Sequence, residues 1–182
     1  MERFGRLVPP MIRATVPERI VAHCTLFESL PAPSRGEVLE RLASLEPGLR
    51  LLDEPGPAMV FRWQRTVHVL GLVRRPVDER VELYVTGGPR PRLELHCAPQ
   101  GLHEAHAAGM GGVLAFTAAT ALTAGPTAGI AMLLAGSLVA FVAREHSMIA
   151  LRRRLETLVL DLAAALWPGR PCEIESNLMK ND

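Results

Sequence analysis

Two His-Cys pairs offer the side chains in this sequence that are best suited to metal chemistry. His23-Cys24 lies in an apolar run, and His96-Cys97 lies in a later run where apolar and polar residues alternate. Both runs are typical of strands, and imidazole and thiolate groups from neighbouring strands could meet at a tetrahedral zinc ion. Because adjacent residues of a strand point to opposite faces, each pair offers at most one ligand to a shared site. We favour a core position for Cys24 and Cys97, where free cysteine behaves as a small hydrophobic residue.

Two more histidines, His103 and His106, stand immediately before a long apolar stretch. Residues at this spacing share one face of a helix, and histidine titrates near neutrality. A pH sensor and a metal site are both open interpretations. The favoured one is a pair of polar residues at a membrane surface.

Motifs of known enzyme classes are missing from the sequence. It contains no C-x-x-C pair, no H-E-x-x-H helix, no G-x-S-x-G elbow and no Gly-rich phosphate loop. We therefore predict no catalytic site and no cofactor. His23, His96, His103 and His106 are weak metal candidates only.

No charged residue occurs between Ala107 and Ala143, and Gly125-Pro126 interrupts this stretch once. The pattern predicts two apolar helices, about 27 and 25 Å long at 1.5 Å per residue, joined by a tight turn. A hydrocarbon core is about 30 Å thick, so both arms are at the short end of the spanning range. A helix that is apolar all round is buried or lies in a membrane. We predict a transmembrane helical hairpin over 107–143, and the centre of a soluble helical bundle is the alternative.

Small residues recur along both arms at four-residue spacing, which lets helices approach closely in lipid. They are predicted to pack the arms against each other or to join several hairpins into a homo-oligomer. The residues are Gly112, Ala115, Ala119, Gly125, Pro126, Ala131, Ala135, Gly136 and Ala140.

Positive charge follows the apolar stretch at Arg144, Arg152, Arg153 and Arg154, whereas the central turn carries no charge. The positive-inside rule then predicts an inner membrane protein with both termini in the cytoplasm. These arginines are also predicted to lie at the membrane surface, where anionic lipids attract basic side chains.

The rest of the chain predicts an α+β fold, with a small antiparallel sheet and one or two packed helices in a cytoplasmic domain over 17–105. Ser34 opens a helix through a capping box with Glu37, and Pro47-Gly48 ends it. Alternating apolar residues predict short strands on tight turns. The predicted strands are 19–27, 49–53, 58–63, 67–73, 80–86 and 92–97.

The segment after the apolar stretch predicts a separate amphipathic helix over 145–167. Its leucines recur at spacings of three and four, and this apolar side must be buried. Packing back on the sheet is the favoured placement. Residues 1–16 are predicted to be an N-terminal extension, and 168–182 a flexible tail.

Composition limits the functional classes. The net charge is +1, so no basic field favours nucleic acid. Three scattered cysteines suit reduced thiols in a cytoplasm. The first residues do not resemble a cleavable signal sequence, so the apolar stretch is expected to direct insertion itself.

These features predict a non-enzymatic, membrane-anchored binding or sensing module that self-associates through its hairpin. Its expected partners are the lipid bilayer, further copies of itself, and a small apolar ligand or a protein. One alternative is a pore-forming or membrane-perturbing effector, in which Thr117, Thr120 and Thr123 line an opening. The other alternative is a metal-dependent enzyme that uses the His and Cys residues.

Overall fold

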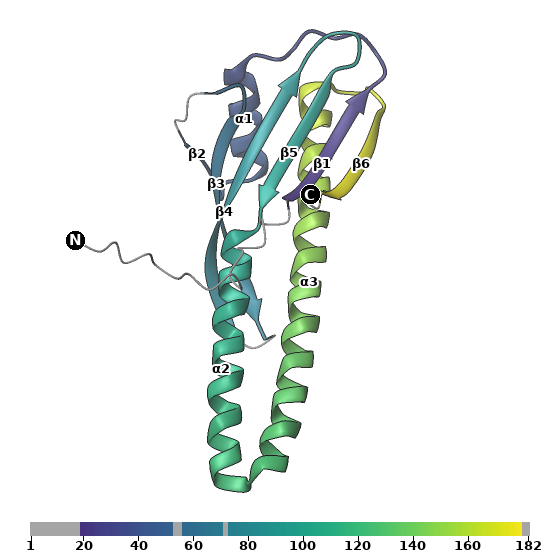
Figure 1. Cartoon of the computed structure of the whole chain (residues 1–182). Helices are drawn as coiled ribbons and strands as arrows, with labels where there is room; N and C mark the ends of the chain where they lie inside the picture. Colours follow the sequence, from purple (N-terminus) through teal and green to yellow (C-terminus); the bar gives the residue numbers. More distant parts are fainter. Residues whose placement is uncertain (1–18, 53–55, 71–72, 180–182) are drawn as a thin grey trace, which may run out of the picture.

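A computed structural model describes residues 19–52, 56–70 and 73–179 of the 182-residue chain. The predicted N-terminal extension, residues 1–16, lies outside the described residues. The described chain has an α+β fold, in which a six-stranded antiparallel sheet is combined with three helices, two of them long and apolar (Figure 1).

The sheet has the strand order β2-β3-β4-β5-β1-β6, and every neighbouring pair is antiparallel. Four consecutive strands form a meander, β1 lies beside its last strand, and β6 forms the far edge. The bounds are β1 Arg19–Leu26, β2 Leu49–Leu52, β3 Met59–Val69, β4 Val73–Thr86, β5 Arg92–Ala98 and β6 Cys172–Met179.

The hairpin of β3 and β4 is longer than its sequence predicts. The separate strands predicted over 58–63 and 67–73 are wrong, because β3 continues through the polar residues between them and the chain turns at Leu70, which has a φ of 54°. The polar side chain of Arg65 interrupts the apolar alternation in the sequence of β3. It stands at an inward position of β3, and its guanidinium lies 5.2 Å from the centre of the Trp63 ring. The alternation of inward and outward residues along β3 therefore continues through Arg65.

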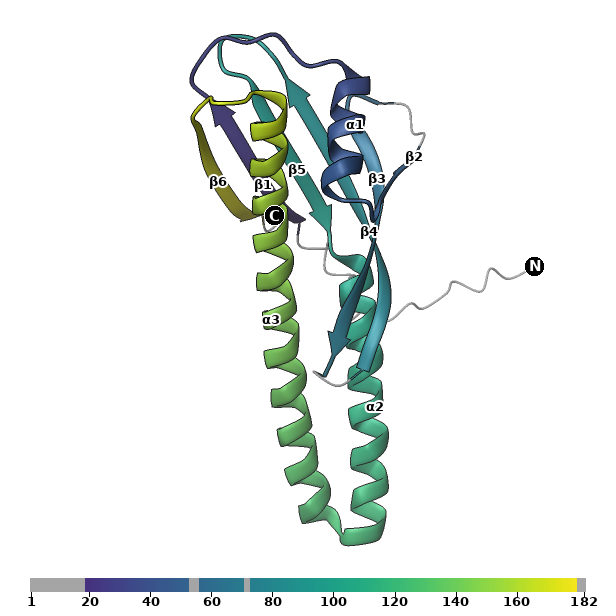
Figure 2. The same cartoon turned by 180° about the vertical axis from the view of Figure 1, so that it is seen from behind.

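β4 begins at Val73, well before the predicted start at Arg80. β5 pairs with β4 only from Arg80 onward, so among the described residues the first half of β4 has β3 on one side and no strand on the other. Pro76 lies in this half, and proline, which has no N–H to donate, is tolerated in a strand that is paired on one side only. We call residues 65–70 and 73–79 the β3–β4 ribbon, and it extends beyond the rest of the sheet (Figures 1 and 2).

The three helices are α1 Arg35–Leu45, α2 Gln100–Ala124 and α3 Pro126–Leu166. The Ser34 half of the predicted capping box is confirmed, since the N–H of Glu37 donates to the Ser34 hydroxyl at 3.2 Å. The predicted separate helix over 145–167 is instead the second part of α3, a single helix of 41 residues. Neither Gly nor Pro occurs between Ser137 and Leu166, and charged residues alone do not end a helix.

The core lies between one face of the sheet and the helices α1 and α3 (Figure 2). The second part of α3 contributes a buried residue at every third or fourth position and contacts β1, β3, β5 and β6. Its largest buried side chains are Met148, Leu151, Leu155, Leu158, Leu162 and Leu166.

The flexible tail predicted over 168–182 is wrong for residues 172–179. These residues form β6, which pairs with β1 from Leu26–Cys172 to Arg19–Met179. Without β6, the edge of β1 would expose a row of unpaired backbone groups. Pairing of the main chain explains an ordered strand in a segment whose polar composition gave no sign of one.

Candidate functional site

Two helices of this chain are long and apolar enough to cross a membrane, α2 and α3. The charge-free residues 107–143 of these helices lie side by side and extend away from the sheet (Figures 1 and 2). We call them the helix pair. No residue from Ala107 to Ala124 is buried, and from Pro126 to Ala143 only Gly129 and Ala140 are.

Exposed apolar side chains concentrate on the helix pair. Among the described residues, ten of the fourteen exposed large hydrophobic side chains belong to it. Leu122 is 88% exposed, Leu134 67% and Phe141 60%. A soluble bundle would cover such side chains with protein, and the described part of the chain does not. The ten are Leu114, Phe116, Leu122, Ile130, Met132, Leu134, Leu138, Val139, Phe141 and Val142.

The two helices approach each other closely at two glycines of α3. A Cβ atom added to Gly136 would lie 2.5 Å from Cγ1 of Val113, and one added to Gly129 would lie 2.6 Å from the Cβ of Ala121. These glycines are seven residues apart, so they share one helix face. That spacing was present in the sequence, but the four-residue pattern of alanines concealed it.

The predicted packing residues fall into two groups. Gly136 and Ala140 face the other helix, and Gly125-Pro126 forms the turn, where Gly125 has a φ of 94°. The remaining small residues lie on exposed faces and do not pack one helix against the other. They are Gly112, Ala115, Ala119, Ala131 and Ala135.

Glu79 of β4 attaches the start of α2 to the sheet. This carboxylate is 1% exposed and accepts hydrogen bonds from the backbone N–H groups of Leu102 at 2.9 Å and Gly101 at 3.2 Å. Pro99, at the N-cap position, provides no side-chain cap, so Glu79 satisfies donors that the helix start leaves free. Gly101 permits the close contact, because an added Cβ would lie 2.7 Å from the carbonyl oxygen of Asp78.

The environment of Glu79 shifts its ionisation. Burial raises the pKa of Glu79 to about 7, although the two backbone hydrogen bonds and the Arg65 guanidinium favour the charged form. Burial also lowers the pKa of Arg65, and the nearby Glu79 opposes that change. The start of α2 is therefore held by a buried carboxyl group whose ionisation depends on its surroundings.

His106 is the other polar side chain buried at the base of the helix pair. It is 5% exposed, and among the described residues neither of its ring nitrogens has a hydrogen-bond partner. His103, one turn earlier on α2, is partly exposed and makes an interaction of its own. In the described part of the chain, no three His, Cys, Asp or Glu side chains are grouped so that they could hold a metal ion.

The strands that carry the two His-Cys pairs are neighbours. In each pair the cysteine lies on one face of the sheet and the histidine on the other. Cys24 and Cys97 are buried on the helix-covered face, where burial raises the pKa of each thiol to about 12. His23 and His96 lie on the opposite face, where His23 stands across from Glu94 and His96 across from Val21. The thiols and imidazoles therefore do not meet.

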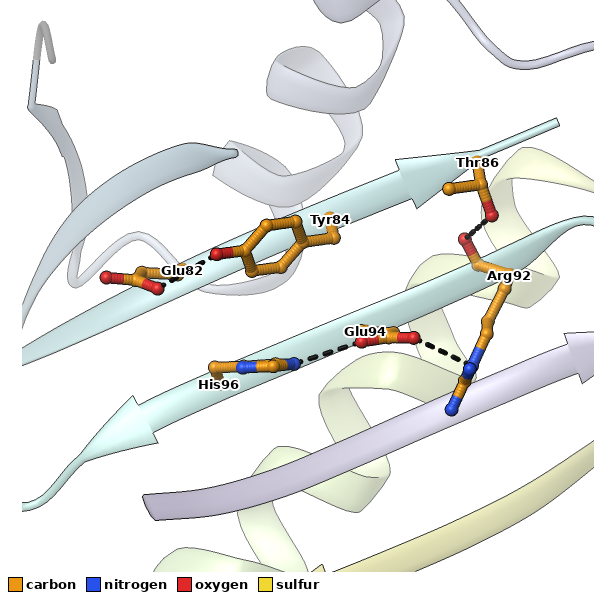
Figure 3. A network of polar contacts seen from close by, with 6 residues as sticks. All are labelled: Glu82, Tyr84, Thr86, Arg92, Glu94 and His96. Carbon is orange, nitrogen blue, oxygen red and sulfur yellow. Dashed lines mark hydrogen bonds and ion pairs between the residues drawn. The ribbon is translucent and has the colours of Figure 1, made fainter. Parts of the chain in front are cut away.

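On the face of the sheet that points away from the helices, the described residues include a network of paired polar groups (Figure 3). Glu94 bridges Arg92 at 2.8 Å and His96 at 3.0 Å, and the Tyr84 hydroxyl donates to Glu82 at 3.1 Å. The rings of Tyr84 and His96 have centroids 5.0 Å apart. Each carboxylate of this network is already engaged, as on a solvated polar surface.

A depression of about 280 Å³ lies on the same face, between β5, β1 and β6. Most of its side chains are polar, which does not suit an apolar ligand. It is lined by His23, Thr25, Phe27, Arg90, Arg92 and Glu173.

No protein-family model, curated protein or solved structure matches this chain. Function must therefore be inferred from the chain's own geometry. The feature that a water-soluble surface does not account for is the exposed apolar helix pair.

Proposed function

We propose that this protein is a binding or sensing module anchored in the inner membrane by its helix pair, with the sheet domain in the cytoplasm. The observation that carries the proposal is the exposure of ten large apolar side chains on two charge-free helical segments. In a bilayer these apolar side chains would be surrounded by hydrocarbon instead of water, which is favourable.

Energetics favour insertion of the helix pair. Leu, Ile, Phe and Val contribute roughly −0.3 to −0.6 kcal/mol each at the centre of a membrane helix, so the nine exposed residues of these types contribute about −3 to −5 kcal/mol before the small and polar residues are counted. The hydroxyls of Thr120 and Thr123 donate to the carbonyls of Phe116 and Ala119, each at 2.9 Å. Such bonds let threonine reside in hydrocarbon without water.

The flanking charges support the orientation. Arg144, Arg152, Arg153 and Arg154 follow the second segment, whereas the turn at Gly125-Pro126 carries no charge. The positive-inside rule assigns the arginines to the cytoplasm, and two crossings return the chain to the same side. Arg152 and Arg154 pair with Glu156 and Glu46, but acidic residues contribute little to this rule.

Self-association would use the small residues that do not pack the helix pair internally. Gly112, Ala115 and Ala119 form an exposed strip on α2, along which a second copy could approach closely. The sheet domain would then bind a protein or a small ligand at the cytoplasmic surface. Since its depression beside His23 is lined mainly by polar groups, a polar partner fits it better than the apolar ligand that the sequence suggested.

Fractionation of the full-length protein tests the anchoring. We expect it to sediment with membranes after lysis without detergent and to stay there through carbonate extraction. Replacing the exposed Leu134 and Leu138 by Asp should release it, because each aspartate at a helix centre costs about 2.5–3.5 kcal/mol. The matched control replaces the exposed Leu51 of the sheet domain by Asp. Recovery of the unaltered protein in the soluble fraction would refute the proposal.

Orientation is tested by cysteine labelling in intact cells. In a chain with Cys172 replaced by Ser, a cysteine at Thr127 should react with a membrane-impermeant maleimide added outside. A cysteine at the exposed Ala150 should react with this reagent only after the membrane is permeabilised. The reverse pattern would overturn the cytoplasmic placement but leave the anchoring intact.

A further inference from the structure

The tip of the β3–β4 ribbon lies beside the first residues of the charge-free segment. A Cβ added to Gly109 of α2 would lie 2.6 Å from Cγ1 of Val69 and 3.5 Å from Cγ of Leu70. Both views show the ribbon following α2 beyond the rest of the sheet (Figures 1 and 2). The charge-free segment starts at Ala107, so the ribbon tip is level with its beginning.

The register of the two helices gives the depth of the tip relative to the nearest charge on α3. Gly136 faces Val113, and Gly129 faces Ala121. Continued along the pair, the same register sets Gly109 level with Ala140. Ala140 is one helical turn, roughly 6 Å, closer to the Gly125 turn than Arg144 is. If the helix pair spans a bilayer, the ribbon tip reaches the boundary between headgroups and hydrocarbon.

The tip combines apolar and basic side chains, which suits a boundary between headgroups and hydrocarbon. Val73 is 59% exposed, although it is apolar, and Leu70 is half-buried against α2. Arg74 and Arg75 follow directly and are both exposed. They lie opposite His68 and Val67 in the ladder, and no acidic residue occurs from Val67 to Val77.

The two arginines also lie where β4 does not pair with β5, and no strand of the described residues lies on that side of them. Successive residues of a strand point to opposite faces, and Arg74 and Arg75 therefore extend to both sides of the ribbon. A planar guanidinium binds phosphate oxygens through paired N–H groups. An exposed apolar tip with arginines on both sides is complementary to an anionic lipid surface.

We propose that the tip of the β3–β4 ribbon is a second membrane contact that binds anionic phospholipid headgroups. Val73 and Leu70 enter the boundary between headgroups and acyl chains, and Arg74 and Arg75 bind the phosphates. This inference rests on the proposed function, because the helix pair sets the plane of the membrane. Binding of these headgroups makes the sheet domain sensitive to the lipid composition around the protein.

Depth-dependent fluorescence quenching tests the contact in the full-length protein. In a chain with Cys172 replaced by Ser, a bimane label is attached at Val73→Cys or, separately, at Leu134→Cys, and the protein is reconstituted in vesicles of phosphatidylcholine with or without phosphatidylglycerol. Leu134 is 67% exposed and lies roughly 9 Å closer to the Gly125 turn than Ala140 does. Nitroxide lipids labelled near the headgroup or deep in the acyl chain serve as quenchers.

We expect the headgroup nitroxide to quench bimane at position 73, and more strongly with phosphatidylglycerol present. The double substitution R74Q/R75Q should remove most of this dependence on phosphatidylglycerol. The matched control is R50Q/R62Q, which removes two exposed arginines that face each other across β2 and β3, away from the tip. It should leave the dependence unchanged.

The outcomes separate the inference from the anchoring. If the acyl-chain nitroxide quenches position 134 but neither nitroxide quenches position 73, the lipid contact of the ribbon is refuted and the anchor stands. If position 73 is quenched equally in both lipid mixtures, the binding of anionic headgroups is refuted. If position 134 is not quenched at all, the transmembrane anchor fails, and quenching at position 73 would then show that the ribbon binds lipid without it.

Discussion

The carboxylate of Glu79 accepts a hydrogen bond of 2.9 Å from the backbone N–H of Leu102, so that a side chain of β4 closes the first turn of α2. Glu79→Ala would leave that N–H and the one of Gly101 without an acceptor and remove the counter-charge of Arg65. We expect the free energy of unfolding to fall by about 2–4 kcal/mol. Chemical unfolding in detergent measures it, with Asp78→Ala on the exposed side of β4 as the control. An equal loss in both variants would contradict a specific role for Glu79.

The raised pKa of Glu79 predicts a dependence of stability on pH. Its value of about 7 in the folded chain exceeds 4.5, so the folded state binds more protons than the unfolded state between these pH values. The free energy of unfolding should therefore decrease as pH rises through that window and level off above it. Thermal unfolding across the window measures the effect. Glu79→Gln keeps one acceptor and cannot ionise, so a slope that persists in this variant would assign the dependence to another group.

Close packing of the helix pair depends on Gly136. Gly136→Leu would force its Cβ to within 2.5 Å of Val113, and overpacking of this kind costs about 1–3 kcal/mol. Gly112→Leu is a matched control, because a Cβ there meets nothing within 4 Å. We expect only the first variant to lower the melting temperature in detergent. Val113→Ala should restore part of the loss, and no recovery would argue against this contact.

Sequence patterns predicted the parts of this fold that local chemistry determines. Ser34 caps α1 because its hydroxyl reaches the N–H of Glu37 within one turn. Gly125 turns the chain because it adopts a φ of 94° that other residues avoid. The core position predicted for Cys24 and Cys97 is confirmed, since both side chains are buried.

Features that depend on distant partners could not be predicted. Arg65 stands at an inward position near Glu79, which is 14 residues later in the chain. β6 is ordered by backbone pairing with β1, more than 140 residues earlier in the chain. The ribbon tip reaches α2 through Gly109, a contact that no periodicity encodes. The capping of α2 by Glu79 could not be predicted for the same reason. The sequence at the start of α2 does not show which distant side chain accepts its N–H groups.

The buried thiols should resist modification. Burial raises the pKa of Cys24 and Cys97 to about 12, so near neutral pH almost no thiolate forms at either residue. Cys172 is only partly buried and should react first. Counting maleimide adducts by mass spectrometry before and after unfolding checks this. The folded protein should carry one adduct and the unfolded protein three. Rapid labelling of all three cysteines in the folded protein would contradict the buried positions.

Self-association through α2 predicts a variant that loses its oligomer and keeps its fold. Gly112 and Ala115 are exposed and do not pack against α3, so leucine at both positions leaves the helix pair intact. The larger side chains would keep a second copy from approaching, because close backbone contact in lipid requires small residues. We expect the double variant to shift toward monomer in analytical ultracentrifugation in detergent, with an unchanged melting temperature. Ala131→Leu and Ala135→Leu on the exposed side of α3 serve as the comparison. If only the α3 pair disrupts the oligomer, the interface belongs to α3, and if neither pair does, the small residues do not mediate association.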